Sequence, residues 1–284
     1  MNIALIGIGL MGQALAEHLI AQGISLSVFN RTPDKVENLA QSGATVYSSA
    51  QAVVDQNDYC LLMLSDAIAI NDVLDTIDPA SFKNRLFIQM GTIAPEQSRS
   101  IAKRITSLQG RYLECPVLGS LPEARTGKLI LMAGGDKTDF DKALPLLNLI
   151  GSMPRYIGDI GQGAAVKLAM NQLIAGLTAS FALSLALVQK QGIDTEQFMQ
   201  IVRESALYAP TFDKKLDRML QQDYANPNFP TKHLAKDITL FLDVAKSLGL
   251  DVSGLEGIEK LLNKTLEQGL ANTDYSALYA GIIH

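Results

Sequence analysis

Lys167 and Asn171 stand four residues apart, directly after a glycine-rich turn that contains Gly161 and Gly163. On a helix this spacing places both side chains on one face. The segment 168–188 carries no charge, so Lys167 marks the start of a long apolar helix. A lysine there could simply reach along apolar surface to water. The chemical alternative is a proton donor, because reducing a carbonyl by hydride leaves an alkoxide that needs a proton or a positive charge beside it. We predict that Lys167 is the catalytic acid, placed where two domains meet, and that Asn171 holds the lysine or the substrate.

A second chemical motif, Gly7-Ile8-Gly9-Leu10-Met11-Gly12, follows the first strand-like segment and opens a helix. Glycines at this spacing allow a tight turn, and they let a pyrophosphate approach the backbone at a helix N-terminus, where free N–H groups favour anions. A purely structural glycine turn is the alternative. The placement between strand and helix favours a dinucleotide site, with Gly7, Gly9, Leu10, Met11 and Gly12 as its cofactor-binding residues.

The next strand ends in Phe29-Asn30-Arg31-Thr32, where NAD-binding units usually have an acidic residue for the ribose 2′-hydroxyl. No acid is present, and Arg31 and Thr32 can donate hydrogen bonds to a 2′-phosphate. Arg31 could instead be a solvated surface charge. We therefore predict a preference for NADP(H) over NAD(H), with Asn30, Arg31 and Thr32 as cofactor-binding residues.

Other predicted strands end in small or apolar residues that would lie at the same edge of the sheet, where open α/β sheets bind ligands. Met90-Gly91-Thr92 is one such end, and Pro116-Val117-Leu118-Gly119-Ser120 forms another. The second turn could present N–H groups and a hydroxyl to a carboxylate or carbonyl. We also place Met63 and Leu64, at the end of the apolar run 58–64, among the cofactor contacts.

A last polar cluster runs from Phe229 to Asp237 and includes His233 and Lys236. This cluster could be no more than a helix start with a basic face, and we interpret His233 as a structural rather than a catalytic residue. The three histidines are widely separated and show no metal-ligand spacing with the cysteines. We predict no metal.

The elements that must position these residues alternate between strand and helix up to about residue 160. Strands are predicted at 2–6, 25–29, 45–47, 58–64, 85–90, 112–117, 128–133 and 155–157, and helices at 10–22, from 49, at 95–109 and at 137–149, with a further helix capped by Thr32 and begun by Pro33. Alternation of this kind predicts a doubly wound Rossmann domain with a mainly parallel sheet. We assign residues 1–160 to this NADP-binding domain.

After residue 160 the strand signals stop, and residues 161–284 form a predicted all-helical domain for substrate binding and oligomerisation. Its helices are predicted to run from 161 to 191, from 194 after a capping pair of Asp194 and Gln197, and over 210–222, 231–248, 253–268 and 275–282. The apolar part of the first helix is long enough to cross a bilayer. It contains Asn171, Gln172 and several hydroxyl side chains, so a helix buried between domains or subunits fits better. Its small residues favour close packing in a homodimer or homotetramer.

Composition agrees with an ordinary globular protein, since 19% of the 284 residues are charged and 48% are hydrophobic. A net charge of −5 gives no electrostatic footprint for nucleic acid or acidic membranes. Cys60 and Cys115 lie inside apolar strand-like runs, which predicts reduced core thiols. The first residues read as a strand with no basic segment before them, so we expect no signal peptide and a cytoplasmic location.

Taken in order, these motifs resemble the β-hydroxyacid dehydrogenase family, which includes the 3-hydroxyisobutyrate dehydrogenases. The resemblance covers essentially the whole chain, and the pair Lys236-Asp237 completes it. Within the family the sequence is most similar to the NADPH-dependent glyoxylate and succinic semialdehyde reductases, through Asn30-Arg31-Thr32, 119–124 and 229–233. The resemblance implies that Lys167 is catalytic, that Thr92 and Lys236 contact the cofactor, and that further residues line the substrate site. These are Leu118, Gly119, Ser120, Phe229 and Asp237.

Two positions depart from the family pattern. Leu118 stands where the substrate loop usually has serine, and Gly91 stands where a serine normally precedes Thr92. Each change deletes a hydroxyl that could bind the substrate, so the family pattern does not fix which substrate is reduced. The expected activity is NADPH-dependent reduction of a small aldehyde or 2-oxo acid. Alternatives are an NAD-dependent dehydrogenase of 3-hydroxyisobutyrate type, an imine reductase (which usually lacks the lysine) and a non-catalytic NADP-binding module.

Overall fold

The computed structural model describes residues 1–284 and divides into two compact units, Met1–Lys167 and Leu168–His284. The division falls inside helix α8 (Gln162–Lys190), whose first residues belong to the first unit. The boundary predicted from the sequence, near residue 160, lies just before this helix. The first unit is an α/β domain and the second is helical, which confirms the predicted fold class.

The sheet of the first unit has the strand order β3-β2-β1-β4-β5-β6-β8-β7, with β9 beside β8. Neighbouring strands are parallel from β3 to β6, whereas β8 runs antiparallel to β6 and to β7. The first six strands therefore have the order of a doubly wound nucleotide-binding fold. The strands are β1 (Ile3–Ile6), β2 (Leu26–Phe29), β3 (Thr45–Val46), β4 (Tyr59–Leu62), β5 (Leu86–Gln89), β6 (Arg111–Glu114), β7 (Val117–Leu118), β8 (Ile130–Gly135) and β9 (Arg155–Gly158).

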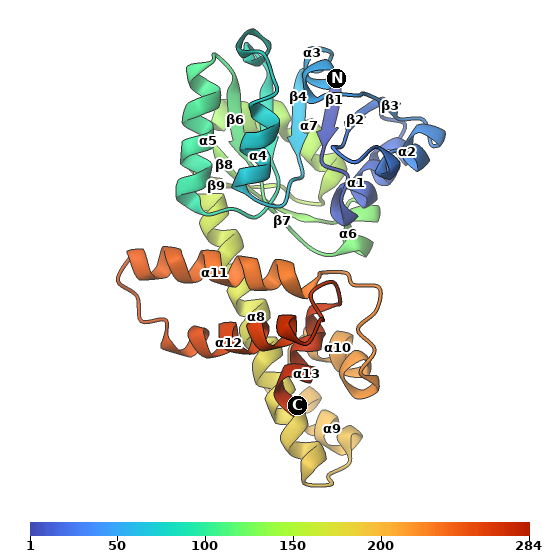
Figure 1. The fold of residues 1–284 in the computed structure, drawn as a ribbon, viewed down its shortest axis with the longest axis vertical. Helices are drawn as coiled ribbons and strands as arrows, with labels where there is room; N and C mark the ends of the chain where they lie inside the picture. The colour runs from blue at the N-terminus through green and yellow to red at the C-terminus, as the bar shows by residue number, and fades with distance from the viewer. The chain divides into compact units, whose positions relative to one another are not determined.

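Helices cover both faces of this sheet (Figure 1). Alternate strand residues point to opposite cores: Ile3 and Leu5 belong to one, Ala4 and Ile6 to the other. Apolar residues on both faces explain why the strands read as continuous apolar runs. The helices of this unit are α1 (Leu10–Ala21), α2 (Glu37–Gln41), α3 (Ala50–Asp55), α4 (Ala67–Leu74), α5 (Pro95–Ser107), α6 (Leu121–Arg125) and α7 (Lys137–Ile150).

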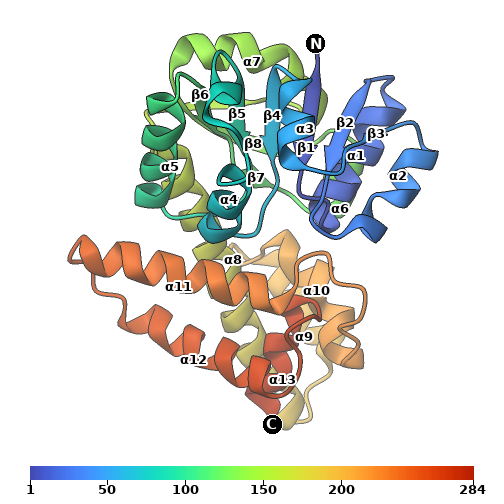
Figure 2. The same ribbon diagram turned by 45° about the horizontal axis from the view of Figure 1, so that its top comes forward.

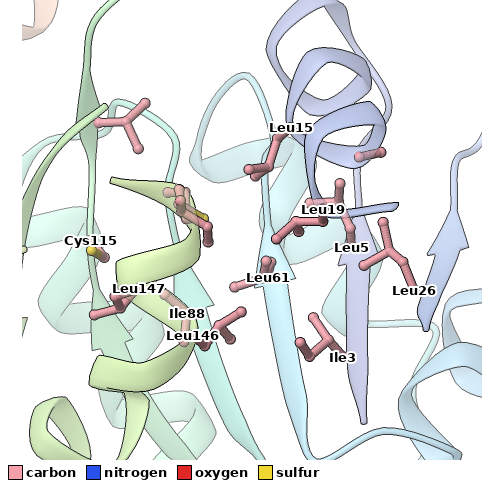
Figure 3. Close-up of a cluster of buried hydrophobic side chains, with 14 of the residues drawn as sticks. Ile3, Leu5, Leu15, Leu19, Leu26, Leu61, Ile88, Cys115, Leu146 and Leu147 are labelled. Atoms are coloured by element: carbon pink, nitrogen blue, oxygen red, sulfur yellow. The ribbon is translucent and has the colours of Figure 1, made fainter. Parts of the chain in front are cut away.

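One of the two cores lies under α1 and α7, where leucines of both helices pack over the strands (Figure 3). The other core lies under α3, α4 and α5. Cys60 and Cys115 are both fully buried and unpaired, as predicted for core thiols. Burial raises the pKa of the Cys60 thiol to about 12, so it stays neutral.

Three local predictions differ from the structure. The apolar run 112–117 forms two strands rather than one, because the chain turns at Cys115-Pro116 and β7 then pairs antiparallel with β8. Thr32 precedes a single 3₁₀ turn (Pro33–Lys35), and its side chain makes no capping hydrogen bond. The short helices α4 and α6 have no predicted counterpart, since five to eight residues carry little periodic signal.

The second unit contains the rest of α8 and five further helices. They are α9 (Thr195–Glu204), α10 (Pro210–Gln221), α11 (Thr231–Ser247), α12 (Ser253–Glu267) and α13 (Leu278–Ile283). Helices α11 and α12 form a hairpin, seen in Figures 1 and 2. The carboxylate of Asp194 accepts the N–H of Gln197 over 3.2 Å, so the predicted cap of α9 is present. Gly192 ends α8 with a φ of +68°, as predicted.

Helix α8 is long and apolar enough to cross a membrane, with a mean hydropathy of 1.6 in its most apolar window. In this structure 44% of that window is buried inside the protein. The core helix of a soluble protein passes the same test, so length and composition alone do not assign α8 to a membrane.

Candidate active site

The turn between β1 and α1 contains three glycines that the structure treats differently. Gly7 has a φ of +102°, and a Cβ there would lie 2.4 Å from the backbone oxygen of Met63. A Cβ on Gly12 would lie 2.0 Å from the oxygen of Gly7. The fold itself therefore requires glycine at both positions. A Cβ on Gly9, at the N-cap of α1, would meet nothing within 4 Å.

This open space at Gly9 fits a dinucleotide. The protein has no steric need for glycine there, but a pyrophosphate at the start of α1 would come close to that backbone. Leu10 is half exposed on the first turn of α1, and no acidic residue lies in that turn. The predicted cofactor residues Met63 and Leu64 follow β4 directly beside Gly7. The residues present thus suit the anionic group that the motif predicts.

Asn30 has a structural task that the sequence did not reveal. Its Oδ1 accepts the backbone N–H of Ile8 over 2.9 Å, and its Nδ2 donates to the backbone oxygen of Thr32 over 2.9 Å. Asn30 therefore ties the end of β2 to the glycine turn. Arg31 is exposed and makes no hydrogen bond or ion pair within the chain, which leaves its guanidinium available to a ligand.

The packing around Gly91 leaves no room for a side chain. A Cβ there would lie 2.2 Å from the backbone oxygen of Leu64 and 3.2 Å from Nε2 of Gln89. Gln89 in turn donates to the oxygen of Gly91 over 3.0 Å. The loop after β4 thus occupies the place of the serine that the family pattern has before Thr92.

In the turn 116–120, the backbone N–H and the hydroxyl of Ser120 are hydrogen-bonded within the chain. The backbone N–H of Ser120 donates to Oε2 of Glu123 over 2.7 Å, and the Ser120 hydroxyl donates to the same oxygen over 2.6 Å. The first of these bonds is the half of a capping box in which the Glu123 carboxylate accepts the N–H of the N-cap residue of α6. A substrate carboxylate at this turn would have to compete with Glu123. Leu118 is partly buried in β7, paired with Ile130 of β8.

Glu114, the last residue of β6, is a buried carboxylate that the sequence did not single out. Its Oε1 accepts the backbone N–H groups of Gly161 over 2.8 Å and of Ala164 over 3.1 Å, at the start of α8. Its Oε2 accepts the hydroxyl of Ser98, which also pairs with the Tyr112 hydroxyl. Burial raises the pKa of Glu114, while these hydrogen bonds act in the opposite direction. No local pattern points to this role, because the partners lie 47 and 50 residues further along the chain.

Lys167 and Asn171 occupy successive turns of α8, and both are buried, at 9% and 1% exposure. In the second unit, Nδ2 of Asn171 donates to Oδ2 of Asp237 over 2.6 Å. Nζ of Lys236 lies 2.9 Å from Oδ1 of Asp237, an ion-pair distance, although the two atoms are not aligned as a hydrogen bond. Oδ1 of Asn171 is buried without a hydrogen-bond partner. The structure therefore brings Asn171, Lys236 and Asp237 together.

Phe229, the remaining predicted substrate residue, packs edge-on against Tyr275 at 5.8 Å between ring centroids. The ammonium of Lys215 lies 4.2 Å from the centroid of the Tyr275 ring and pairs with both oxygens of Asp274, at 2.8 and 2.9 Å. This buried pair fixes the segment against which Phe229 rests. In residues 1–284 no group of three or more histidine, cysteine or acidic side chains is arranged so that it could hold a metal ion.

Two sequence profiles of known protein domains together match nearly the whole chain. A sequence profile of the NAD-binding domain of 6-phosphogluconate dehydrogenase matches residues 2–158, and one described as NAD-binding of NADP-dependent 3-hydroxyisobutyrate dehydrogenase matches 161–282. Glyoxylate/succinic semialdehyde reductase 2 of Arabidopsis thaliana, a chloroplastic protein, is 33% identical over 98% of this chain and 78% of its own length. Glyoxylate/succinic semialdehyde reductase 1 of the same plant is 31% identical over 99% of this chain and 98% of its own.

A solved structure of 3-hydroxyisobutyrate dehydrogenase from Mycobacterium tuberculosis covers all of both chains with a TM-score of 0.87 at 24% identity, a likeness of fold. The doubly wound domain, its glycine turn and the helical second unit define an NAD(P)-dependent oxidoreductase. The chain belongs to the β-hydroxyacid dehydrogenase family.

Proposed function

We propose that this enzyme uses NADPH to reduce a small aldehyde or 2-oxo acid to the hydroxy acid, with Lys167 as the general acid. The observation that carries the proposal is the arrangement on α8. A buried lysine is followed one turn later by a buried asparagine whose amide is held by Asp237. Relatives named glyoxylate/succinic semialdehyde reductase, at 31 to 33% identity, support the substrate class.

The cofactor supplies a hydride for the carbonyl carbon. Gly9 and the N-terminus of α1 would hold its pyrophosphate, and Arg31 and Thr32 its 2′-phosphate. The ammonium of Lys167 would stabilise the developing alkoxide and then give it a proton. Asn171 Oδ1, buried and without a partner, would accept a hydrogen bond from the hydroxyl of the product or from the lysine.

The experiment is a panel of carbonyl compounds, including glyoxylate and succinic semialdehyde, with NADPH and NADH oxidation followed by absorbance. We expect turnover with NADPH and a strong loss in Lys167→Ala, because a positioned acid contributes on the order of 10²–10⁴ in rate. Turnover within about tenfold of the wild type in Lys167→Ala would remove the acid role. Activity confined to NAD⁺ and 3-hydroxyisobutyrate would favour the oxidative alternative.

We also propose that the enzyme is a homo-oligomer. One face of α8 exposes an apolar row, which includes Leu173, Leu183 and Leu187 at 51%, 62% and 63% exposure. Small residues such as Ala169, Ser180 and Ser184 lie along the same face and would let a second helix approach closely. Light scattering should show more than one chain per particle, and Leu183→Glu combined with Leu187→Glu should reduce that number. A wild-type monomer would contradict the proposal.

A further inference from the structure

Glu114 is a buried carboxylate that the proposed chemistry does not use. It has 0% exposure, it lies at the carboxyl end of β6, and it forms no ion pair with a lysine or arginine. A buried negative charge is costly unless hydrogen bonds or positive charge compensate it. Its surroundings should therefore show what keeps it there.

Backbone N–H groups of α8 provide that compensation. Oε1 accepts hydrogen bonds from Gly161 at 2.8 Å and Ala164 at 3.1 Å, two of the donors that a helix start leaves without intrahelical partners. Ser98 holds the other oxygen, supported by Tyr112 through a 2.8 Å contact between the two hydroxyls. The carboxylate is thus fixed from both sides.

Two glycines make room for this carboxylate. A Cβ on Gly134, in β8, would lie 2.5 Å from Oε1 of Glu114, and a Cβ on Gly163 would lie 3.1 Å from the same oxygen. A Cβ on Gly163 would also lie 2.4 Å from the backbone oxygen of Met132. The first turn of α8 therefore packs directly on β8 and on Glu114.

Lys167 follows Gly163 by four residues and Ala164 by three, so it lies on the same side of α8 as both. Helical side chains lean toward the N-terminus, which directs Lys167 back over the turn that Glu114 caps. All of these residues belong to the first compact unit. The one buried carboxylate at this helix start thus stands next to the turn that carries the proposed acid.

We propose that Glu114 is a positioning residue for Lys167: it fixes the first turn of α8 and places a carboxylate behind the lysine. This inference rests on the proposed role of Lys167. A neutral serine or asparagine would suffice to cap a helix. A buried carboxylate adds an electrostatic effect, because it offsets the positive end of the helix dipole and favours the protonated lysine.

The test compares Glu114→Gln with Ser98→Ala. Glutamine keeps an oxygen that can accept the N–H groups of α8 but removes the charge, whereas Ser98→Ala keeps the charge and removes one hydrogen bond. We expect Glu114→Gln to lower kcat by about 10- to 100-fold with NADPH affinity retained. Because the acid must be protonated, kcat falls at high pH. In Glu114→Gln the pH at which kcat falls should be lower by about one unit, the effect expected of one charge acting over roughly 10 Å. Ser98→Ala should leave its position unchanged.

A second measurement does not need catalysis. The rate of acylation of Lys167 by acetic anhydride, read by peptide mass spectrometry across pH, reports when the amine loses its proton. Glu114→Gln should shift that profile to lower pH, and Glu114→Asp, which keeps the charge, should stay near the wild type. A wild-type profile in Glu114→Gln, or in Glu114→Asp a shift as large as that of the glutamine variant, would overturn the inference. If Lys167→Ala remains active but the shift is present, the proposed function fails and the coupling stands.

Discussion

The side-chain amide of Asn171 donates to Asp237 over 2.6 Å and leaves its own oxygen buried and without a partner. This contact selects one of the two orientations of the amide, since Asp237 accepts hydrogen bonds and Asn171 can meet it only with nitrogen. The oxygen of Asn171 is then fixed as an acceptor. Through this contact Asp237 orients the Asn171 amide.

We therefore predict that Asp237→Asn lowers kcat by at least about tenfold, because the new amide no longer dictates which end of Asn171 faces it. Asn171→Ala should lower kcat similarly. The double variant should be no worse than the more damaged single variant, since both changes remove the same oriented oxygen. Steady-state kinetics on the four proteins checks this. Fully additive losses would mean that the two residues act separately.

Arg31 offers a test of cofactor choice. Arg31→Ala should weaken NADPH binding by about 10- to 100-fold, the loss of one or two hydrogen bonds from a charged donor to phosphate. NADH affinity should change little, since it has no 2′-phosphate, and it serves as the internal control. Fluorescence titration of both cofactors gives the two dissociation constants. Equal losses for the two would show that Arg31 supports the turn rather than the phosphate.

The buried pair of Lys215 and Asp274 gives a prediction on stability. Lys215→Met should lower the free energy of unfolding by about 3–5 kcal/mol, because it leaves a buried carboxylate uncompensated. Adding Asp274→Asn should recover most of that loss. Burial alone would raise the pKa of Asp274, but Lys215 and Ser276 lower it below its usual value of 3.8.

A depressed folded pKa means that the contribution of Asp274 is fully present above its unfolded pKa of 3.8 and is lost as the pH falls through the lower folded value. The wild type should therefore lose more stability than the double variant when the pH is taken from 6 to below 3.8. Urea unfolding at a series of pH values measures both slopes. Parallel slopes would contradict the prediction.

The two positions that depart from the family pattern should respond differently to restoration. Leu118→Ser should fold with a stability loss of about 1 kcal/mol, because the side chain is only partly buried, and it should lower KM for substrates that carry a carboxylate. Gly91→Ser should be destabilised more strongly, since its Cβ would lie 2.2 Å from the backbone oxygen of Leu64. Thermal unfolding and kinetics with glyoxylate compare the two. A stable Gly91→Ser enzyme would show that the loop after β4 adjusts freely.

The fold could be predicted from sequence wherever a pattern is local. Apolar runs separated by helix starts gave the parallel sheet, and Asp194 and Gly192 marked the ends of two helices. The split of 112–117 into two strands depends on long-range pairing with β8, which no window of sequence contains.

In the candidate site, too, only the features that depend on local spacing could be predicted from the sequence. The glycine turn, Lys167 and Asn171 follow from spacing, but the contacts that orient them do not. Glu114 meets α8 across 47 to 50 residues, and Asn171 meets Asp237 across 66. The sequence placed the Ser120 hydroxyl on a small turn, where it could bind a substrate. Only the structure shows that this hydroxyl already donates a hydrogen bond to Glu123.

Folding requires glycine at Gly7 and Gly12 but not at Gly9, where only ligand binding would require it. Gly7 and Gly12 are held by contacts inside the protein, whereas nothing in the fold touches the space beside Gly9. A library randomised at these three codons and selected only for soluble expression should keep the outer two glycines and let the middle one drift. Selection for turnover should restore it.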